Sequence, residues 1–294
     1  FRKAYGRELA VPVTWQEYDQ LAKFFHRPEK GLYGTVEQRE RDTAWMFWLP
    51  RYLSQGAPYR QLFDDRLKPM IDSPAGVAAT ESYISTVRHS APEILGDGKD
   101  YSYTAPIFMQ GKAFSIIFTI AGAKLFNASG SAVRGKFIAA ALPGNKVGGK
   151  LVRRNLPIYG NNLVVSSQGA QRKLAFLFTM WLTDPDNSLR TVGVRGGFTD
   201  PFRWNHLLDQ RIRDLYTPEA LAVFAKEWPV ALPPGTGLPG DGDYLTALNQ
   251  NLWLAASGKI TAAEAMKRTS REWEGLISRQ DRDSHLAWLK IFNA

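Results

Sequence analysis

The stretch 155–187 constrains the fold most strongly, because a strand, a polar turn and a helix follow one another within it. Residues 156–166 form an apolar run centred on Gly160, which is typical of a buried strand. Residues 170–182 then carry large apolar side chains at helical spacing, and Asp184-Pro185 marks the end of that helix. A strand followed by a helix predicts an α/β unit.

Helix start signals organise much of the remaining chain. Thr14 and Glu17 form a capping box ahead of apolar residues at helical spacing, and Ser73 precedes a proline that can occupy the first helical position. Thr261 opens a second capping box before a helix that we expect to run to about residue 277. A further helix is predicted over 243–257, where Gly258 follows it.

The strands are predicted in the middle of the chain. Residues 136–142 have the composition of a buried strand ended by Pro143-Gly144, and residues 145–150 have the composition of a loop. The proline- and glycine-rich stretch 230–242 is predicted to be irregular. Strands separated by helices, with helices dominating the last third, indicate the α/β class.

Composition limits the class of protein. The 294 residues are 44% hydrophobic, which is ample for a packed core. The longest apolar stretch, 113–123, has about half the roughly 20 residues that a membrane-spanning helix needs. The absence of cysteine excludes disulfides, thiolate metal sites and cysteine nucleophiles. No membrane span is expected.

The basic charge does not indicate nucleic-acid binding. The formal net charge is +9, but lysine and arginine are spread evenly and form only pairs such as Arg153-Arg154. Release of counterions from nucleic acid needs several charges on one face. We therefore expect a solvated basic surface and no nucleic-acid partner.

Nine short motifs follow one another along nearly the whole chain. They are Pro12-Val-Thr-Trp-Gln-Glu-Tyr18, Gly31-Leu-Tyr-Gly34, Gly56, Asp72-Ser-Pro-Ala-Gly-Val77, Phe108-Met-Gln-Gly-Lys-Ala113, Ser131-Ala-Val-Arg-Gly-Lys136, Tyr159-Gly160, Gly196-Gly-Phe-Thr-Asp-Pro-Phe-Arg203 and Ser257-Gly-Lys-Ile-Thr-Ala-Ala-Glu-Ala265. In this order they resemble the motifs of the sugar-type extracellular solute-binding proteins of ABC importers, the relatives of maltose-binding protein.

The resemblance implies a periplasmic binding protein fold of type II, with two lobes. It implies that residues 1–142 are the first segment of the second lobe, that 143–200 are the crossover and the segment returning to the first lobe, and that 201–294 are the closing helices of the second lobe. Family members place about a hundred or more residues before the Thr-Trp-x-Glu segment, and only 13 precede Thr14 here. The first lobe is therefore expected to be incomplete in this chain or completed by a separate fragment.

By position in the family pattern, eight residues are candidates for ligand contact. They are Asp42, Trp45, Phe118, Tyr159, Gly160, Asn161, Arg203 and Tyr244. Aromatic rings can stack on the C–H faces of a sugar, and the amide, carboxylate and guanidinium groups can bind its hydroxyls. The amide of Asn161 is also expected at the carboxyl end of a strand, where ligands of α/β sheets bind.

Several candidates also fit a purely structural role. Trp45 and Trp48 lie three residues apart on an apolar helical stretch and could both belong to the core. Phe118 follows two isoleucines in what could be a buried strand, and Arg203 could cap a turn. Asp42 could be one of several charges on a solvated face.

The resemblance implies a non-catalytic periplasmic component that binds a carbohydrate or polyol between its lobes and delivers it to an ABC permease in the inner membrane. A monomer is expected, with no metal and no cofactor. The glycine pattern 235–240 contains a proline where a dinucleotide-binding helix would begin, which argues against that cofactor. The alternatives are a glycosidase-like enzyme whose carboxylates pair only in space, and a basic nucleic-acid binder.

Overall fold

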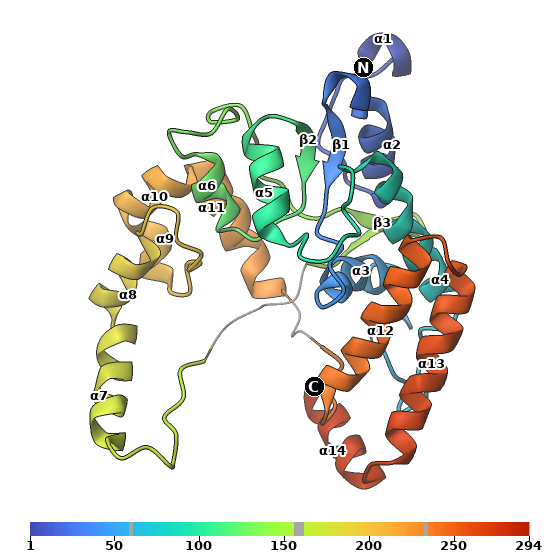
Figure 1. Cartoon of the computed structure of the whole chain (residues 1–294), viewed down its shortest axis with the longest axis vertical. Helices are drawn as coiled ribbons and strands as arrows, with labels where there is room; N and C mark the ends of the chain where they lie inside the picture. Colours follow the sequence, from blue (N-terminus) through green and yellow to red (C-terminus); the bar gives the residue numbers. More distant parts are fainter. Residues whose placement is uncertain (59–60, 156–161, 232–234, 294) are drawn as a thin grey trace. The chain divides into compact units, whose positions relative to one another are not determined.

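The computed structural model describes residues 1–58, 61–155, 162–231 and 235–293 of the chain (Figure 1). The chain divides into two compact units. Unit 1 comprises 1–117, 141–158 and 230–294, and unit 2 comprises 118–140 and 159–229. Residues 118–140 and 201–229 thus belong to unit 2. The division into lobe segments stays a prediction.

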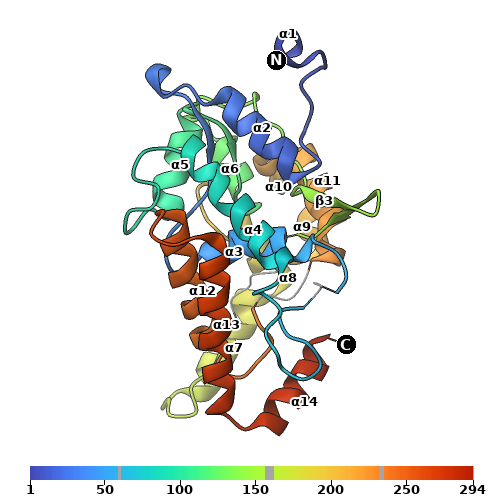
Figure 2. The same ribbon diagram turned by 90° about the vertical axis from the view of Figure 1, so that its right-hand side faces the viewer.

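Unit 1 is mostly helical, and the helices over 241–256 and 262–278 lie side by side in both views (Figures 1 and 2). Its α-helices are α1 (Arg2–Tyr5), α2 (Trp15–Phe25), α3 (Ala44–Leu53), α4 (Pro74–Ser85), α5 (Tyr101–Met109), α12 (Asp241–Ala256), α13 (Ala262–Ser278) and α14 (Arg282–Asn293). Short 3-10 helices are η1 (Pro28–Lys30) and η2 (Thr86–His89), and η3 (Trp228–Val230) spans the boundary between the units.

The predicted helix starts at Thr14, Ser73 and Thr261 are confirmed. Thr14 and Glu17 form the full capping box of α2, and the side chains of Ser73 and Thr261 accept backbone hydrogen bonds at the beginnings of α4 and α13. Each of these side chains satisfies an N–H group that the helix itself leaves without a partner.

Two small sheets are found among the described residues of unit 1. Strand β1 (Tyr33–Val36) pairs in parallel with β2 (Ala113–Ile116), with Val36 opposite Ile116. Strand β3 (Gly144–Val147) pairs antiparallel with β4 (Lys150–Arg153). The first pair joins segments far apart in the sequence, and the second is a local hairpin.

The predicted strand over 136–142 is wrong, and so is the predicted loop over 145–150. Residues 136–142 have no regular structure, and the Ile138 side chain is largely exposed. The hairpin of β3 and β4 turns through Gly148 and Gly149, whose φ angles are 55° and 78°. Two successive positive φ angles are what a tight two-residue hairpin turn requires, so glycine here joins strands. Residues 162–166 of the other predicted strand are likewise irregular.

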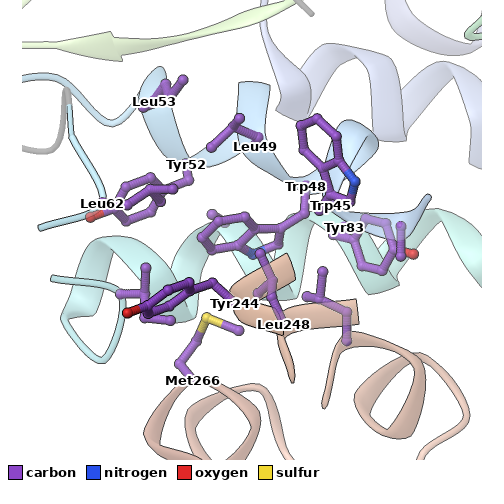
Figure 3. Close-up of a cluster of buried hydrophobic side chains, with 14 of the residues drawn as sticks. Trp45, Trp48, Leu49, Tyr52, Leu53, Leu62, Tyr83, Tyr244, Leu248 and Met266 are labelled. Atoms are coloured by element: carbon purple, nitrogen blue, oxygen red, sulfur yellow. The ribbon is translucent and has the colours of Figure 1, made fainter. Parts of the chain in front are cut away.

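The core of unit 1 lies where α3 and α4 meet α12 and α13. Figure 3 shows side chains of these helices gathered around the ring of Trp48, which is fully buried and stacks on Tyr52 with ring centroids 5.0 Å apart. Trp273 of α13 is also fully buried, and its indole N–H donates to the carbonyl of Tyr244 at 2.8 Å. The last helices of the chain thus complete the core begun by the first ones.

Helix α2 approaches strand β1 so closely that no side chain fits between them. A Cβ atom at Gly34 would lie 1.8 Å from the carbonyl oxygen of Ala22. That neighbour is backbone and cannot turn aside, so glycine is required for this contact between helix and strand.

Unit 2 is built from short helices and has one small hydrophobic core among its described residues. They are α6 (Gly122–Phe126), α7 (Arg172–Thr183), α8 (Pro185–Val192), α9 (Trp204–Leu208), α10 (Gln210–Tyr216) and α11 (Pro218–Glu227). Val192, Ile212 and Tyr216 are among its fully buried core residues. Within the described part of unit 2 there is no strand. None of the described helices of either unit has the length and apolarity that crossing a membrane would need.

Candidate functional site

The eight predicted site residues fall in different parts of the structure. Tyr159, Gly160 and Asn161 lie outside the described residues. Asp42, Trp45 and Tyr244 belong to unit 1, and Phe118 and Arg203 belong to unit 2. Each unit therefore contributes its own candidates.

The carboxyl ends of β1 and β2 form one edge of the parallel pair. The segment 37–43 follows β1 and carries Asp42, and Phe118 comes two residues after β2 as the first residue of unit 2. The carboxyl ends of parallel strands are where α/β sheets bind ligands.

The segment after β1 carries the carboxylates of Glu40 and Asp42 outside the core. Asp42 is exposed. Partial burial raises the pKa of neighbouring Glu40, and the charges of Asp100 and Asp42 raise that pKa further. Such carboxylates can accept hydrogen bonds from the hydroxyl groups of a neutral ligand.

Directly after β1, a buried ion cluster anchors this segment. The Glu37 carboxylate lies 3.1 Å from Nη1 of Arg39 and 2.9 Å from Nη2 of Arg51, and the Thr86 hydroxyl donates to it at 3.0 Å. The side chains of all three charged residues are essentially inaccessible. Burial acts to raise the pKa of Glu37, but Arg39 and Arg51 outweigh it and hold the pKa below its usual value.

Trp45 and Tyr244 are placed in the core of unit 1 (Figure 3). Only 6% of Trp45 is exposed, and its backbone N–H donates to Oδ1 of Asn249 at 2.8 Å. Only 1% of Tyr244 is exposed, and its hydroxyl shares a hydrogen bond of 3.3 Å with Nε2 of His285. These contacts match the core interpretation weighed for Trp45. Direct ligand contact by either ring stays a prediction.

Phe118 is half-buried, and part of its ring packs on helix α6. The ring lies edge-on to Phe126 with centroids 5.6 Å apart, and a Cβ atom at Gly122 would meet it at 2.5 Å. Gly122 therefore keeps room for the ring. The remaining exposed part of the ring is an apolar surface on which a sugar could stack.

Arg203 ties two parts of unit 2 together and keeps one donor free. Its Nη2 donates to the carbonyl of Thr183 at the end of α7 at 2.6 Å, which matches the turn-capping alternative. Its Nε is buried and has no hydrogen-bond partner among the described residues. A buried donor without a partner is costly to the folded state.

The aromatic neighbours of Arg203 were not among the predicted site residues. Phe202 and Trp204 are both exposed, and the Trp204 ring lies 5.3 Å from that of Trp228. The guanidinium of Arg203 lies 5.7 Å from the centre of the Phe202 ring. The run Pro201-Phe-Arg-Trp204 contained this signal, since two rings flank a cation in four residues.

A shallow groove of about 440 Å³ runs between α12 and α13. Asp243, Gln250, Glu272 and Arg279 are among its lining residues, and none of the eight predicted site residues lines it. Within the described ranges, no three His, Asp or Glu side chains are arranged to hold a metal ion.

Comparisons with known proteins agree on one fold. The model of the bacterial extracellular solute-binding protein family matches residues 3–188. The structure of maltose-bound MalE3 from T. maritima superposes with a TM-score of 0.74 at 21% identity, over 94% of this chain and 68% of that one. No match was found among curated proteins.

Two further solved structures come from ABC transporter solute-binding proteins. The protein of Agrobacterium vitis S4 with bound D-mannitol has a TM-score of 0.73 at 18% identity, over 95% of this chain and 69% of its own. The protein of Agrobacterium radiobacter K84 in complex with ribitol has a TM-score of 0.73 at 21% identity, over 94% of this chain and 67% of its own. The predicted α/β fold of two-lobed binding proteins is confirmed.

Proposed function

Since the chain belongs to the bacterial extracellular solute-binding protein family, we propose that it is the substrate-binding component of an ABC importer and that its ligand is a carbohydrate or polyol. The family match over residues 3–188 carries this proposal. Members of the family bind a solute without chemistry, so the non-catalytic role predicted for the chain is confirmed and nothing favours a glycosidase.

The ligands of similar structures support the ligand class. Maltose, D-mannitol and ribitol are bound in three of them. All three are neutral and carry hydroxyl groups on a compact carbon skeleton. For this chain we therefore propose a neutral, polyhydroxylated ligand.

The described candidates have the chemistry for such a ligand. The half-buried Phe118 ring and the exposed Phe202 and Trp204 rings can pack on C–H faces. The Asp42 carboxylate and the guanidinium of the partly exposed Arg203 can bind hydroxyls. Each ligand hydroxyl left without a partner in a closed site costs roughly 1 to 3 kcal/mol, which is how a few polar groups select one sugar. Tyr159, Gly160, Asn161, Trp45 and Tyr244 remain proposed contacts.

The family is extracellular, and we place this chain in the periplasm with an ABC permease of the inner membrane as its partner. We propose that it acts as a monomer, with the remaining part of its first lobe supplied by further polypeptide. Closure of two lobes on the ligand would present the permease with a shape that the open protein lacks.

Binding can be tested by titrating maltose, D-mannitol and ribitol while following the fluorescence of the nine tryptophans. We expect saturable binding of at least one of them at one site per chain. Chromatography of the same mixtures should show the sugar unchanged. Formation of a product would contradict the proposal. So would the absence of saturable binding of any sugar or polyol when the chain is combined with the polypeptide that completes its first lobe.

Substitution of Phe118 tests its part in the site. Phe118→Ala removes the stacking surface, and we expect affinity to fall about tenfold, or roughly 1.4 kcal/mol. The control is Trp288→Ala on α14, a half-exposed ring in unit 1, which is expected to leave affinity unchanged. Equal affinity of the Phe118 variant and the original chain would remove Phe118 from the site.

A further inference from the structure

Lys124 is a buried charge of unit 2 that is not among the candidate site residues. It lies on the short helix α6, and only 3% of the residue is exposed. Its ammonium donates to the backbone carbonyls of Val192 at 3.0 Å, Thr199 at 3.2 Å and Val194 at 3.5 Å. A protonated lysine has three N–H donors, so three carbonyl partners match the charged form of the side chain.

The carbonyls that Lys124 contacts lie at and after the end of a helix. Val192 is the last residue of α8, and the final carbonyls of a helix have no partner within it. Residues 193–203, between α8 and α9, form turns and irregular chain. An ammonium at the end of a helix also interacts favourably with the helix dipole. Lys124 therefore brings donors to this segment from a distant part of the sequence.

Two further groups complete the surroundings of the ammonium. Burial raises the pKa of Asp200 to about 6, and the positive charge of Lys124 acts against this rise. The ammonium also lies 5.2 Å from the centre of the Tyr216 ring, whose hydroxyl donates to the carbonyl of Thr199 at 3.1 Å. A buried ammonium is costly unless it is hydrogen-bonded and faces an opposite charge. The carbonyls, the carboxylate and the ring together suit a cation at this position.

The segment that Lys124 holds leads directly into the aromatic run 201–204. Phe202 and Trp204 of this run are exposed, so packing in a core does not fix their rings. Their backbone is fixed instead by polar contacts on both sides. Lys124 bonds to the carbonyl of Thr199 before the run, and the N–H of Phe202 donates to Nδ1 of the buried His206 at 3.4 Å.

We propose that Lys124 is a positioning residue for ligand binding, whose ammonium holds the backbone over 192–200 in the form that presents Phe202 and Trp204 to a sugar or polyol. Lys124 acts through this backbone and does not touch the ligand. The proposal rests on the proposed function, because it takes the two exposed rings to be ligand contacts. Without the ammonium the carbonyls lose a donor and Asp200 loses its counter-charge, so the run should become more mobile.

Hydrogen exchange measured by mass spectrometry tests the hold on the backbone without any sugar. A peptide spanning 194–204 contains the hydrogen-bonded N–H groups of Gly197 and Phe202. We expect its exchange to be at least about tenfold faster in Lys124→Ala, while exchange in α11 changes less than about twofold. The control is Lys136→Ala in the same unit, which removes an exposed lysine that donates to the nearby carbonyl of Ala132. The control should leave both exchange rates unchanged.

Chemical rescue tests whether the ammonium itself is responsible. Lys124→Ala removes three carbons and the ammonium, and n-propylammonium supplies the same group. We expect millimolar n-propylammonium to restore slow exchange over 194–204 in this variant and to leave the original chain unchanged. The uncharged 1-propanol should have no effect.

A second variant guards against loss of folding. Lys124→Met keeps most of the packing of the side chain but removes its charge. It should show the same faster exchange and should resist rescue, because its side chain fills the space that n-propylammonium would need. If Lys124→Ala does not fold, Lys124→Met carries the exchange test.

Titration of the same variants with maltose, D-mannitol and ribitol connects the backbone to the ligand. The affinity for whichever of them the original chain binds should fall at least about tenfold in Lys124→Ala and recover with n-propylammonium. Lys136→Ala should stay within about twofold of the original. Unchanged exchange in Lys124→Ala and Lys124→Met would overturn the proposal, and so would faster exchange with unchanged affinity. If the original chain binds no sugar or polyol, the proposed function fails and the ligand part of this proposal falls with it, while exchange alone decides whether Lys124 holds the segment.

Discussion

At the scale of single residues, the fully buried charges after β1 have the largest energetic consequences. Glu37 has two arginines and a threonine hydroxyl around it and no access to water. The attraction between these charges offsets the cost of removing them from water only while all partners are present. The cluster therefore fixes the course of the chain between β1 and the segment that carries Asp42.

Glu37→Gln is expected to destabilise unit 1 by about 3 kcal/mol or more, because it leaves Arg39 and Arg51 buried without a counter-charge. The control is Glu264→Gln, which removes an exposed pair with Arg268 and should cost less than about 1 kcal/mol. Urea denaturation at neutral pH measures both. Equal effects of the two substitutions would show that the buried cluster is not stabilising.

The same cluster predicts a dependence of stability on pH. The pKa of Glu37 is lower in the folded protein than its usual value, so its contribution is complete above that usual value and is lost as the pH falls through the folded value. The original chain should thus lose more stability on acidification than Glu37→Gln does. Denaturation curves recorded from neutral pH into the acid range compare the two.

At the scale of helices and strands, the sequence predicted the features that depend on neighbouring residues, such as the beginnings of helices. Thr14, Ser73 and Thr261 marked helix starts because each side chain bonds to the first turn of its own helix. The prediction of a strand over 136–142 was wrong because an apolar run in the sequence does not show whether a partner strand lies beside it. The β3–β4 hairpin was missed because Gly148-Gly149 was interpreted as loop rather than as a turn between strands.

Gly34→Ala tests the contact between α2 and β1. Its Cβ atom would overlap the carbonyl of Ala22, so helix and strand must separate, and we expect a loss of about 2 kcal/mol or more. The control is Gly242→Ala in α12, where a Cβ atom meets nothing within 4 Å and alanine favours the helix. Thermal unfolding distinguishes them. Two variants of equal stability would show that the approach of α2 is adjustable.

At the scale of the whole molecule, the two units have separate cores. The larger core joins α3 and α4 to α12 and α13, and the smaller one lies among the short helices of unit 2. Sequence analysis placed candidate residues in both units, but it could not distinguish core from surface for Trp45 and Tyr244. That distinction depends on the packing of α12 and α13 against α3. No local sequence pattern predicts this contact between distant segments.

Separate cores predict two unfolding transitions. Ile212→Val removes a methylene from the core of unit 2, and Ile71→Val removes one from the core of unit 1. Each change should cost about 1 kcal/mol and lower only its own transition, by about 4 °C in unit 2 and about 2 °C in unit 1. Scanning calorimetry measures both. A single transition that both substitutions lower equally would mean that the units unfold as one.

The return of α12 to α3 also has a consequence for biosynthesis. The backbone of Trp45 bonds to Asn249, which is 204 positions further along the chain. A ribosome adds about 5 to 20 residues per second, so the nascent α3 waits on the order of 10 to 40 seconds for its partner helix. Until then its apolar side chains lack the helix that buries them in the folded unit. Unit 1 can therefore reach its final packing only after α12 has been synthesised.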